Sequence, residues 1–128
     1  TQVLSGGAPG IVTGLVSPDA GPLTAVVATC SQGGVGWPNL IVLFSGSGEY
    51  YTSSFLADDG DLPLWNDQGF EYVGRNSVRS IEARGESLVI NVDALLLGEC
   101  EACETAPATV HAHVEPSRLV IDRIERNG

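Results

Sequence analysis

The chain has 128 residues, of which 43% are hydrophobic, and a formal net charge of −10 at pH 7. This length predicts a single domain, 1–128, whose core is large enough to fold without a metal ion, and we expect no cofactor. Six basic residues against 16 acids argue against binding to nucleic acid or anionic lipid, because both require Lys or Arg to neutralise phosphates.

The segment 1–48 contains one charged side chain, Asp19, and all six arginines lie at or after Arg75. No apolar run approaches the ~20 residues of a membrane-spanning helix. No basic segment followed by an apolar one opens the chain, so the protein is either cytosolic or has lost its signal segment.

Residues 1–21 are rich in Gly and Pro, and we expect this start to be partly flexible. Pro is tolerated at the first position of a helix, so a short helix beginning at Pro9 is an alternative, which Gly14 and the β-branched residues disfavour. The cluster SPDAGP at 17–22 predicts a turn.

The rest of the chain reads as strands separated by turns and loops. The run LIVLFS at 40–45, the connection GSG at 46–48 and the returning segment 49–56 predict a hairpin. Residues 31–39 and 57–69 read as long loops. Further strands are predicted at 23–30, 70–74 (a short edge strand), 77–85, 86–98, 109–115 and 119–125.

Period-two alternation shows which side chains face inward in these strands. Leu88, Ile90 and Val92 alternate with polar or smaller residues in 86–98, and the strand 109–115 places His111 and His113 opposite its apolar face. Val78 is out of phase with Ile81, so the alternation breaks there. About seven strands with little helix predict a mainly β or α+β fold, as a single antiparallel sheet or a sandwich.

The segment GECEACE at 98–104 contains two of the three cysteines, Cys100 and Cys103. The surrounding glutamates should raise the thiol pKa values, which disfavours redox catalysis. Zinc would need His111 and His113 as further ligands, at a spacing unusual for zinc sites. A disulfide is the favoured interpretation, and joining Cys30 to Cys100 or Cys103 would stabilise by ~4 kcal/mol in the chain-entropy model.

The loop 57–69 is acidic and offers oxygen ligands from Asp58, Asp59, Asp61 and Asp67. Such ligands suit calcium, but Pro63 and Leu64 break the EF-hand pattern, so a solvated loop is the expectation and a metal site only a weak candidate.

The two histidines and the two tryptophans are the remaining candidates for function. His111 and His113 are the only histidines for general acid–base catalysis, and no hydrolase or nucleotide-binding motif accompanies them. Trp37 and Trp65 lie in the two long loops and could contact a partner, since aromatic residues dominate binding hot spots. The alternative is that both tryptophans are core or edge-covering residues.

Two stretches resemble a known family. PLTAVVATCSQGGVGWPNLIVLFSGSGEYY at 22–51 and LVINVDALLLGECEACETAPATVHAHVEPSRLVI at 88–121 are similar to the actinobacterial LppP/LprE-type envelope lipoproteins. The resemblance implies a disulfide between Cys30 and Cys103, with Cys100 as an extra cysteine. It also implies an extracytoplasmic location, with the signal segment and any lipid anchor absent from this chain, and it contains no catalytic signature.

The sequence therefore predicts a non-enzymatic domain of the cell envelope, or a secreted one, that binds an unidentified protein or envelope component. A structural assembly module, of the virion decoration or surface-layer type, is the alternative, because the almost uncharged segment 1–48 could pack against neighbours. A hydrolase using the acids or the histidines is the third hypothesis.

Overall fold

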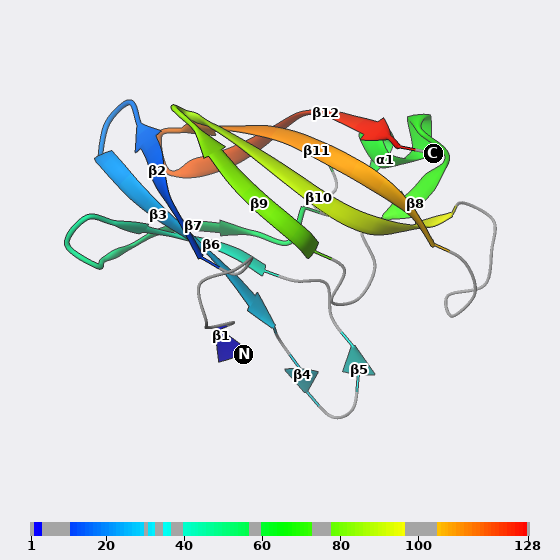
Figure 1. Ribbon diagram of the computed structural model, residues 1–128, viewed down its shortest axis with the longest axis horizontal. Coiled ribbons are helices and arrows are strands. Elements are labelled where there is room, and N and C mark those ends of the chain that lie inside the picture. Colours follow the sequence, from blue (N-terminus) through cyan, green and yellow to red (C-terminus); the bar gives the residue numbers. More distant parts are fainter. Residues whose placement is uncertain are drawn as a thin grey trace.

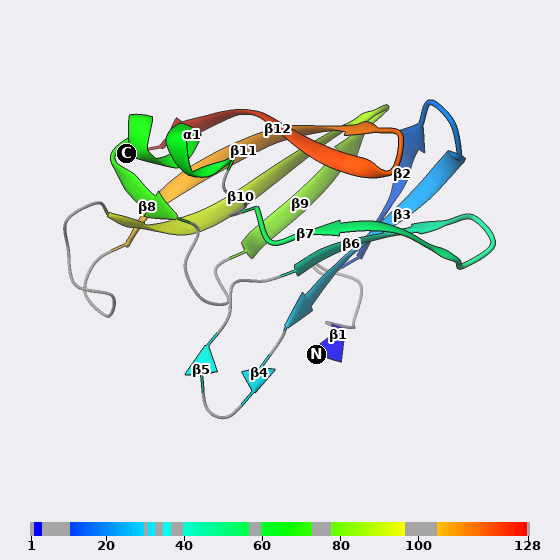
Figure 2. The same cartoon turned by 180° about the vertical axis from the view of Figure 1, so that it is seen from behind.

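The computed structural model of the chain describes residues 2–3, 11–29, 31–32, 35–36, 40–56, 60–72, 78–96 and 105–127. These residues form two antiparallel sheets in two layers, with one short helix at one end (Figures 1 and 2). The prediction of a mainly β or α+β fold, as a single antiparallel sheet or a sandwich, is confirmed, and of the two arrangements the structure has two sheets.

Each sheet contains five strands. The first sheet comprises β1 (Gln2–Val3), β2 (Ile11–Ser17), β3 (Gly21–Thr29), β6 (Leu40–Ser45) and β7 (Tyr50–Ser54). The second comprises β8 (Phe70–Tyr72), β9 (Val78–Arg84), β10 (Ser87–Leu96), β11 (Thr105–Glu115) and β12 (Arg118–Arg126). The short strands β4 (Ser31–Gln32) and β5 (Val35–Gly36) pair separately, and the helix α1 spans Leu62–Asp67.

In the first sheet β3 is central, with β6 on one side and β1 and β2 on the other, and β7 pairs with β6. The predicted hairpin is thus β6–β7, where Ser45 N donates to Glu49 O at 2.8 Å. The alternative of an N-terminal helix is wrong in its described part, because 11–17 is strand β2. Its β-branched residues favour a strand, and Gly14, at φ +92°, lies where the pairing with β3 shifts register.

In the second sheet the predicted alternation is confirmed. Leu88, Ile90 and Val92 are buried, while the residues between them on β10 are half-exposed. β11 pairs with β10 in register from Ser87↔His113 to Leu95↔Thr105, which fixes the same inward phase on β11. The break in alternation at Val78 is a register shift between β9 and β10, in which Arg79 is the extra residue.

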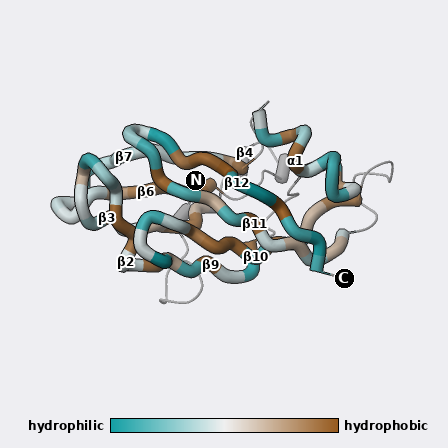
Figure 3. The backbone as a smooth tube through the Cα atoms, turned by 90° about the horizontal axis from the view of Figure 1, so that it is seen from above, coloured by the Kyte–Doolittle hydropathy of each residue, from teal (hydrophilic) through white to brown (hydrophobic). Residues whose placement is uncertain are grey.

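The core fills the space between the two sheets. It combines side chains from both inner faces with two aromatic residues near the helix, Trp65 and Phe70, and includes Leu15, Leu23, Val27, Ile41, Leu43, Leu56, Leu88, Ile90, Val92, Val110, Val114 and Ile124. In Figure 3 hydrophobic and hydrophilic stretches alternate along β12, as expected for a strand with one face in this core.

The two sheets also touch at their edges. Val16 N donates to Gly85 O at 2.8 Å, and Leu15 and Gly85 form an isolated parallel bridge. β2 therefore meets the turn of the β9–β10 hairpin. On the opposite side of the sandwich β7 lies near β12.

The helix α1 closes one end of the sandwich, next to β8 and β12 (Figure 1). It lies in the segment 57–69, which the sequence predicts to be a loop. Pro63 in its first turn suits a helix start, and Trp65 is fully buried, with Nε1 donating to the Leu56 carbonyl at 2.6 Å. The helical residues in the described ranges are too few and too polar to span a membrane.

Candidate functional site

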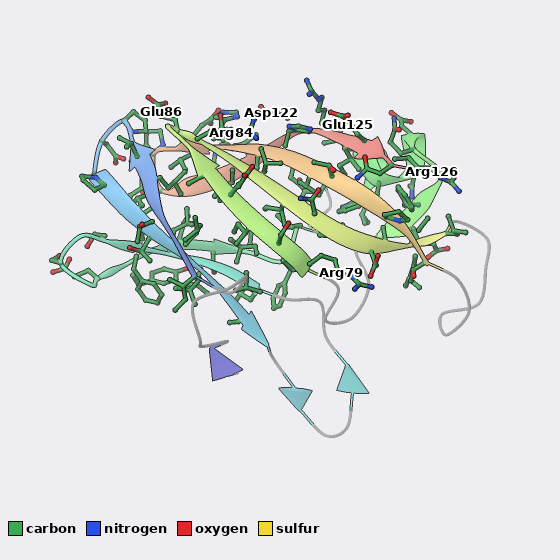
Figure 4. The ribbon with its side chains drawn as sticks, viewed as in Figure 1. Arg79, Arg84, Glu86, Asp122, Glu125 and Arg126 are labelled. Atoms are coloured by element: carbon green, nitrogen blue, oxygen red, sulfur yellow. The ribbon has the colours of Figure 1, made fainter. Side chains whose placement is uncertain are left out.

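The outer face of the second sheet is charged, but its charges are balanced. The strands β9 to β12 contain five acids and five arginines, namely Glu82, Asp93, Glu115, Asp122 and Glu125 with Arg79, Arg84, Arg118, Arg123 and Arg126. Figure 4 shows Arg84, Asp122 and Glu125 on the side that faces away from the first sheet.

The arginines of this face already have partners. All four pair with a carboxylate of the same sheet, in Arg79–Asp93, Arg84–Glu82 (2.9 Å), Arg118–Glu115 (2.7 Å) and Arg123–Glu125 (2.8 Å). Arg126 is not on this outer face: it pairs with Ala108, whose side chain is in the core, and its guanidinium lies over the buried Phe70 ring, 5.5 Å from its centroid. These pairs are solvent-exposed, so each contributes little stability, but together they neutralise the cations that a phosphate would need.

Both histidines lie on this face, as predicted, and contact carboxylates. His113 Nδ1 lies 2.6 Å from Asp122 Oδ1, and its Nε2 lies 2.8 Å from Glu115 Oε2. A carboxylate only accepts hydrogen bonds, so this geometry favours the doubly protonated ring. Accordingly the hydrogen bond with Glu115 is the main cause of the raised pKa of His113. Desolvation is the second largest effect and opposes the rise, and the hydrogen bond with Asp122 adds to it. His111 Nε2 lies 2.7 Å from Glu125 Oε1.

The pKa values of the glutamates that contact the two histidines shift in the opposite direction. The hydrogen bond from Arg118, and next that with His113, lower the pKa of Glu115. Arg123 is the main cause of the lowered pKa of Glu125. The hydrogen bonds of His111 and His113 among the described residues thus lead to carboxylates and not to a serine or cysteine that a histidine base could activate.

A second polar cluster links the two sheets through one tyrosine. The Tyr51 hydroxyl donates to the Asp19 carboxylate at 2.5 Å, accepts from the Ser117 N–H at 2.9 Å, and lies 3.0 Å from Ser17 Oγ. Ser17 is only 3% exposed. Hydrogen bonds from Ser17, and next from Tyr51, lower the pKa of Asp19. This cluster ties the β2–β3 turn and β7 to the β11–β12 turn, which is a structural role.

The outer face of the first sheet is uncharged, unlike the outer face of the second sheet and unlike the polar cluster around Tyr51. None of the strands β2, β3, β6 and β7 contains a charged residue. The cross-strand pairs on this face include Ile11↔Val26↔Val42 and Phe44↔Tyr50. We call this surface the uncharged face, defined by Ile11, Val16, Pro22, Thr24, Val26, Val42, Phe44 and Tyr50.

The uncharged face contains exposed apolar side chains. Among the described residues the large hydrophobic side chains classed as exposed are Ile11 at 39%, Val16 at 41% and Tyr50 at 64%, and all three belong to this face. Val26, on the same face, is only 7% exposed. Ile11 and Val16 lie on β2 and Tyr50 lies on β7, so the exposed side chains are on the same side of the sheet but on strands separated by β3 and β6.

The structure places the predicted site residues in different environments. Trp65, predicted as a contact residue, is 0% exposed and belongs to the core, so that prediction is wrong and the alternative of a core tryptophan is correct. Trp37, the three cysteines Cys30, Cys100 and Cys103, and the acids Asp58 and Asp59 lie outside the described residues. The disulfide and the binding role of Trp37 stay predictions.

The weak metal candidates are not gathered into a site in the part of the chain that the structure describes. Asp61 directly precedes α1 and Asp67 ends it, and no group of three or more His, Cys, Asp or Glu side chains there is suitably placed to hold a metal ion. His113, with its two acidic neighbours, has both ring nitrogens in hydrogen bonds.

Two features of the structure cannot be predicted from individual residues of the sequence. Tyr51 is one of several polar or aromatic residues in a predicted strand, and nothing local in the sequence marks it as the link between sheets. The uncharged face is visible in the sequence only as the near absence of charge from 1–48, and which of these side chains point outward follows from register.

No protein-family model matches the chain, and no significant similarity to a curated protein or to a solved structure was found.

Proposed function

We propose that the protein is a non-enzymatic, extracytoplasmic domain that acts by binding, and that the uncharged face is its contact surface. The single observation behind this proposal is the contrast between the two outer faces. One has arginines and acids already paired with one another, and the other exposes Ile11, Val16 and Tyr50 without a charged residue in its strands.

Covering the uncharged face with a partner is energetically more favourable than covering the charged outer face of the second sheet. A partner that covers the charged face must desolvate ion pairs, which often costs more than the new contacts return. Covering the uncharged face removes apolar side chains from water at about 25 cal/mol per Å². The occupant is then a protein or an envelope component with an apolar surface, and the neutralised arginines disfavour nucleic acid.

Site-specific photo-crosslinking in the native host tests this proposal. Benzoylphenylalanine replaces Tyr50 on the uncharged face in one variant and Val120, on the outer face of β12, in a matched control. We expect a covalent adduct from the variant at Tyr50 and a much weaker one from the variant at Val120. Equal yields from both positions, or none from either, would contradict the proposed contact surface.

The extracytoplasmic location rests on the cysteines and on the resemblance to envelope lipoproteins. We propose that Cys30 pairs with Cys103, with Cys100 as the alternative partner. The intact mass of protein purified from its host, with and without reductant and followed by disulfide mapping, tests this pairing. A fully reduced native protein would contradict both the pairing and the location, since structural disulfides persist in oxidising compartments.

A structural assembly module is the second candidate, and the same face favours it, because flat apolar surfaces also mediate packing between subunits. A hydrolase is the least supported hypothesis. Loss of a hydrolytic activity after His111→Ala or His113→Ala, in a screen of ester, peptide and glycoside substrates, would overturn the non-enzymatic proposal.

A further inference from the structure

We propose that His113 is a pH-dependent switch on the edge strand β12. While both ring nitrogens carry a proton, the ring joins Glu115 at the end of β11 to Asp122 on β12, and loss of one proton releases Asp122. We call these three residues the His113 switch. It lies on the charged outer face of the second sheet and does not involve the uncharged face.

Asp122 is the extra residue of a β-bulge on this edge strand. The pairing of β11 with β12 shifts register between His111 and Ala112, and Asp122 has no residue opposite it on β11. β12 is the outermost strand of the second sheet, and Asp122 and Arg123 are consecutive exposed residues on it (Figure 4). His113 therefore contacts β12 at the irregular point of the strand.

The switch depends on how many N–H groups the ring of His113 has. A doubly protonated imidazole donates from both nitrogens, whereas a neutral one has one N–H and one lone pair. Nδ1 lies 2.6 Å from Asp122 Oδ1 and Nε2 lies 2.8 Å from Glu115 Oε2, and an ionised carboxylate only accepts hydrogen bonds. After deprotonation a ring lone pair faces one of the two carboxylates, so one of the two contacts opens.

Glu115 is the carboxylate that stays in contact with the neutral ring. Its Oε1 also accepts hydrogen bonds from Arg118, from Nε at 3.0 Å and from Nη2 at 2.7 Å, so a second cation holds it in place. Among the described residues, the hydrogen bond recorded for the Asp122 carboxylate is the one with His113. The neutral ring therefore keeps its proton on Nε2, and the bare Nδ1 repels Asp122.

The other charged groups around the ring do not take over its role. They lie on β9, in the β9–β10 turn, on β11 and on β12, namely Glu82, Arg84, Glu86, His111, Arg118, Arg123 and Glu125. Arg123 and His111 both contact Glu125 Oε1, so the cations beside Asp122 are engaged by another carboxylate. The arginines stay charged at every pH of interest, so they do not switch.

Release of Asp122 loosens the edge of the second sheet. A bulged residue has no ladder partner, so its order depends on side-chain contacts such as the one with His113. β12 lies near β7, so this edge borders the first sheet. Bulges on edge strands hinder pairing with another chain. The pKa of His113 is raised, chiefly by its hydrogen bond with Glu115, so the bulge is held below that pKa and loosened above it.

Two NMR measurements on the whole chain, from about pH 5 to about pH 9, test the switch. Long-range ¹H–¹⁵N spectra show which ring nitrogen of His113 carries a proton, and the neutral ring should carry it on Nε2. Backbone order parameters of Asp122 and Arg123 should fall from about 0.85 towards about 0.6 across the same midpoint. Those of β10 should stay constant, which separates a local change from a general one.

The variant Asp122→Asn tests the repulsion directly. Its side-chain amide can donate to the bare Nδ1, so the bulge should stay ordered above the midpoint of His113. His111→Gln is the matched control, because it removes the neighbouring histidine, and it should show the wild-type loss of order. Circular dichroism checks that both variants are folded.

Three results would overturn the switch. The first is a neutral His113 that carries its proton on Nδ1, and the second is a wild-type bulge whose order parameters do not change with pH. The third is a pH response that persists in Asp122→Asn or disappears in His111→Gln. The first two are measured on the unmodified chain, so they decide the matter even where a variant does not fold.

Discussion

At the scale of single residues, the Tyr51 hydroxyl connects β7 to two turns that are distant from it in sequence. Its hydroxyl reaches Asp19 and Ser17 beside the β2–β3 turn and the Ser117 N–H in the β11–β12 turn. The two turns lie far apart in sequence, so fixing them to one group closes a long loop of chain. One hydroxyl group thus joins the two sheets at the end of the sandwich away from α1.

Removing this hydroxyl should destabilise the fold without changing its packing. The variant Tyr51→Phe leaves the partly buried Ser17 hydroxyl and the Ser117 N–H without one partner each, so we expect a loss of about 1–3 kcal/mol in the free energy of unfolding. Urea denaturation measures it. Tyr50→Phe is the matched control, since its exposed hydroxyl contacts only Ser53 among the described residues, and it should cost less than about 0.5 kcal/mol.

His113 should make stability depend on pH near neutrality. Its folded-state pKa is raised, chiefly by Glu115 and next by Asp122, so its contribution is fully present below the unfolded value of about 6.5. That contribution is lost as pH rises through the folded-state pKa. Because the ring is partly exposed, we expect a loss of at most about 1 kcal/mol.

Urea denaturation of the wild type and of His113→Gln between about pH 6 and pH 8.5 measures this effect. The wild type should lose stability relative to the variant as the pH rises. A constant difference across the range would contradict the geometry of His113. NMR titration of its ring should give a midpoint above the usual value, and Glu115→Gln should lower that midpoint.

At the scale of elements, α1 is a six-residue helix held in place by one side chain. An isolated helix this short is unstable in water, so its formation depends on tertiary contacts. Trp65 supplies them through full burial, an edge contact with Phe70 at 6.1 Å and the hydrogen bond to Leu56. Leu56 has a left-handed backbone, at φ +62°, and is itself 1% exposed, so burial offsets the strain where the chain leaves β7.

The variant Trp65→Phe tests whether this tryptophan is structural. It removes the donor to the buried Leu56 carbonyl and leaves a gap in the core, so we expect a loss of about 2–4 kcal/mol. Gln68→Ala, at the exposed end of the same helix, should cost less than about 0.5 kcal/mol. Comparable losses in both variants, measured by urea denaturation, would contradict the role given to Trp65.

The elements differ in how far they can be predicted from sequence. β10 and β11 alternate cleanly because one face is in the core and the other in water, so the sequence predicts both strands and their inward residues. β2 is ambiguous because Gly14 interrupts its pattern at the register shift. α1 is not predictable, since six residues are too few for helical periodicity and its stability comes from distant partners.

At the scale of the whole molecule, the two outer faces differ in charge, and the proposed binding function rests on this asymmetry. The sequence predicts the cause of this asymmetry, because charged residues are nearly absent from 1–48 and almost all of them lie in 49–128. It does not predict the pair Arg79–Asp93, because this pair joins β9 and β10 at their register shift. The pairs Arg84–Glu82 and Arg123–Glu125 are local, since their members lie two residues apart on one strand. The sequence also does not place Tyr51, whose partners are distant in sequence.

The chain crosses from one sheet to the other only once within the described residues, between the end of β7 and the start of β8. Each sheet is therefore built from one half of the chain, mostly by pairing consecutive strands. Separate fragments 1–59 and 60–128 should accordingly complement each other. Trp65 belongs to the second fragment and its acceptor Leu56 to the first, so mixing should shift tryptophan emission beyond the sum of the two separate spectra.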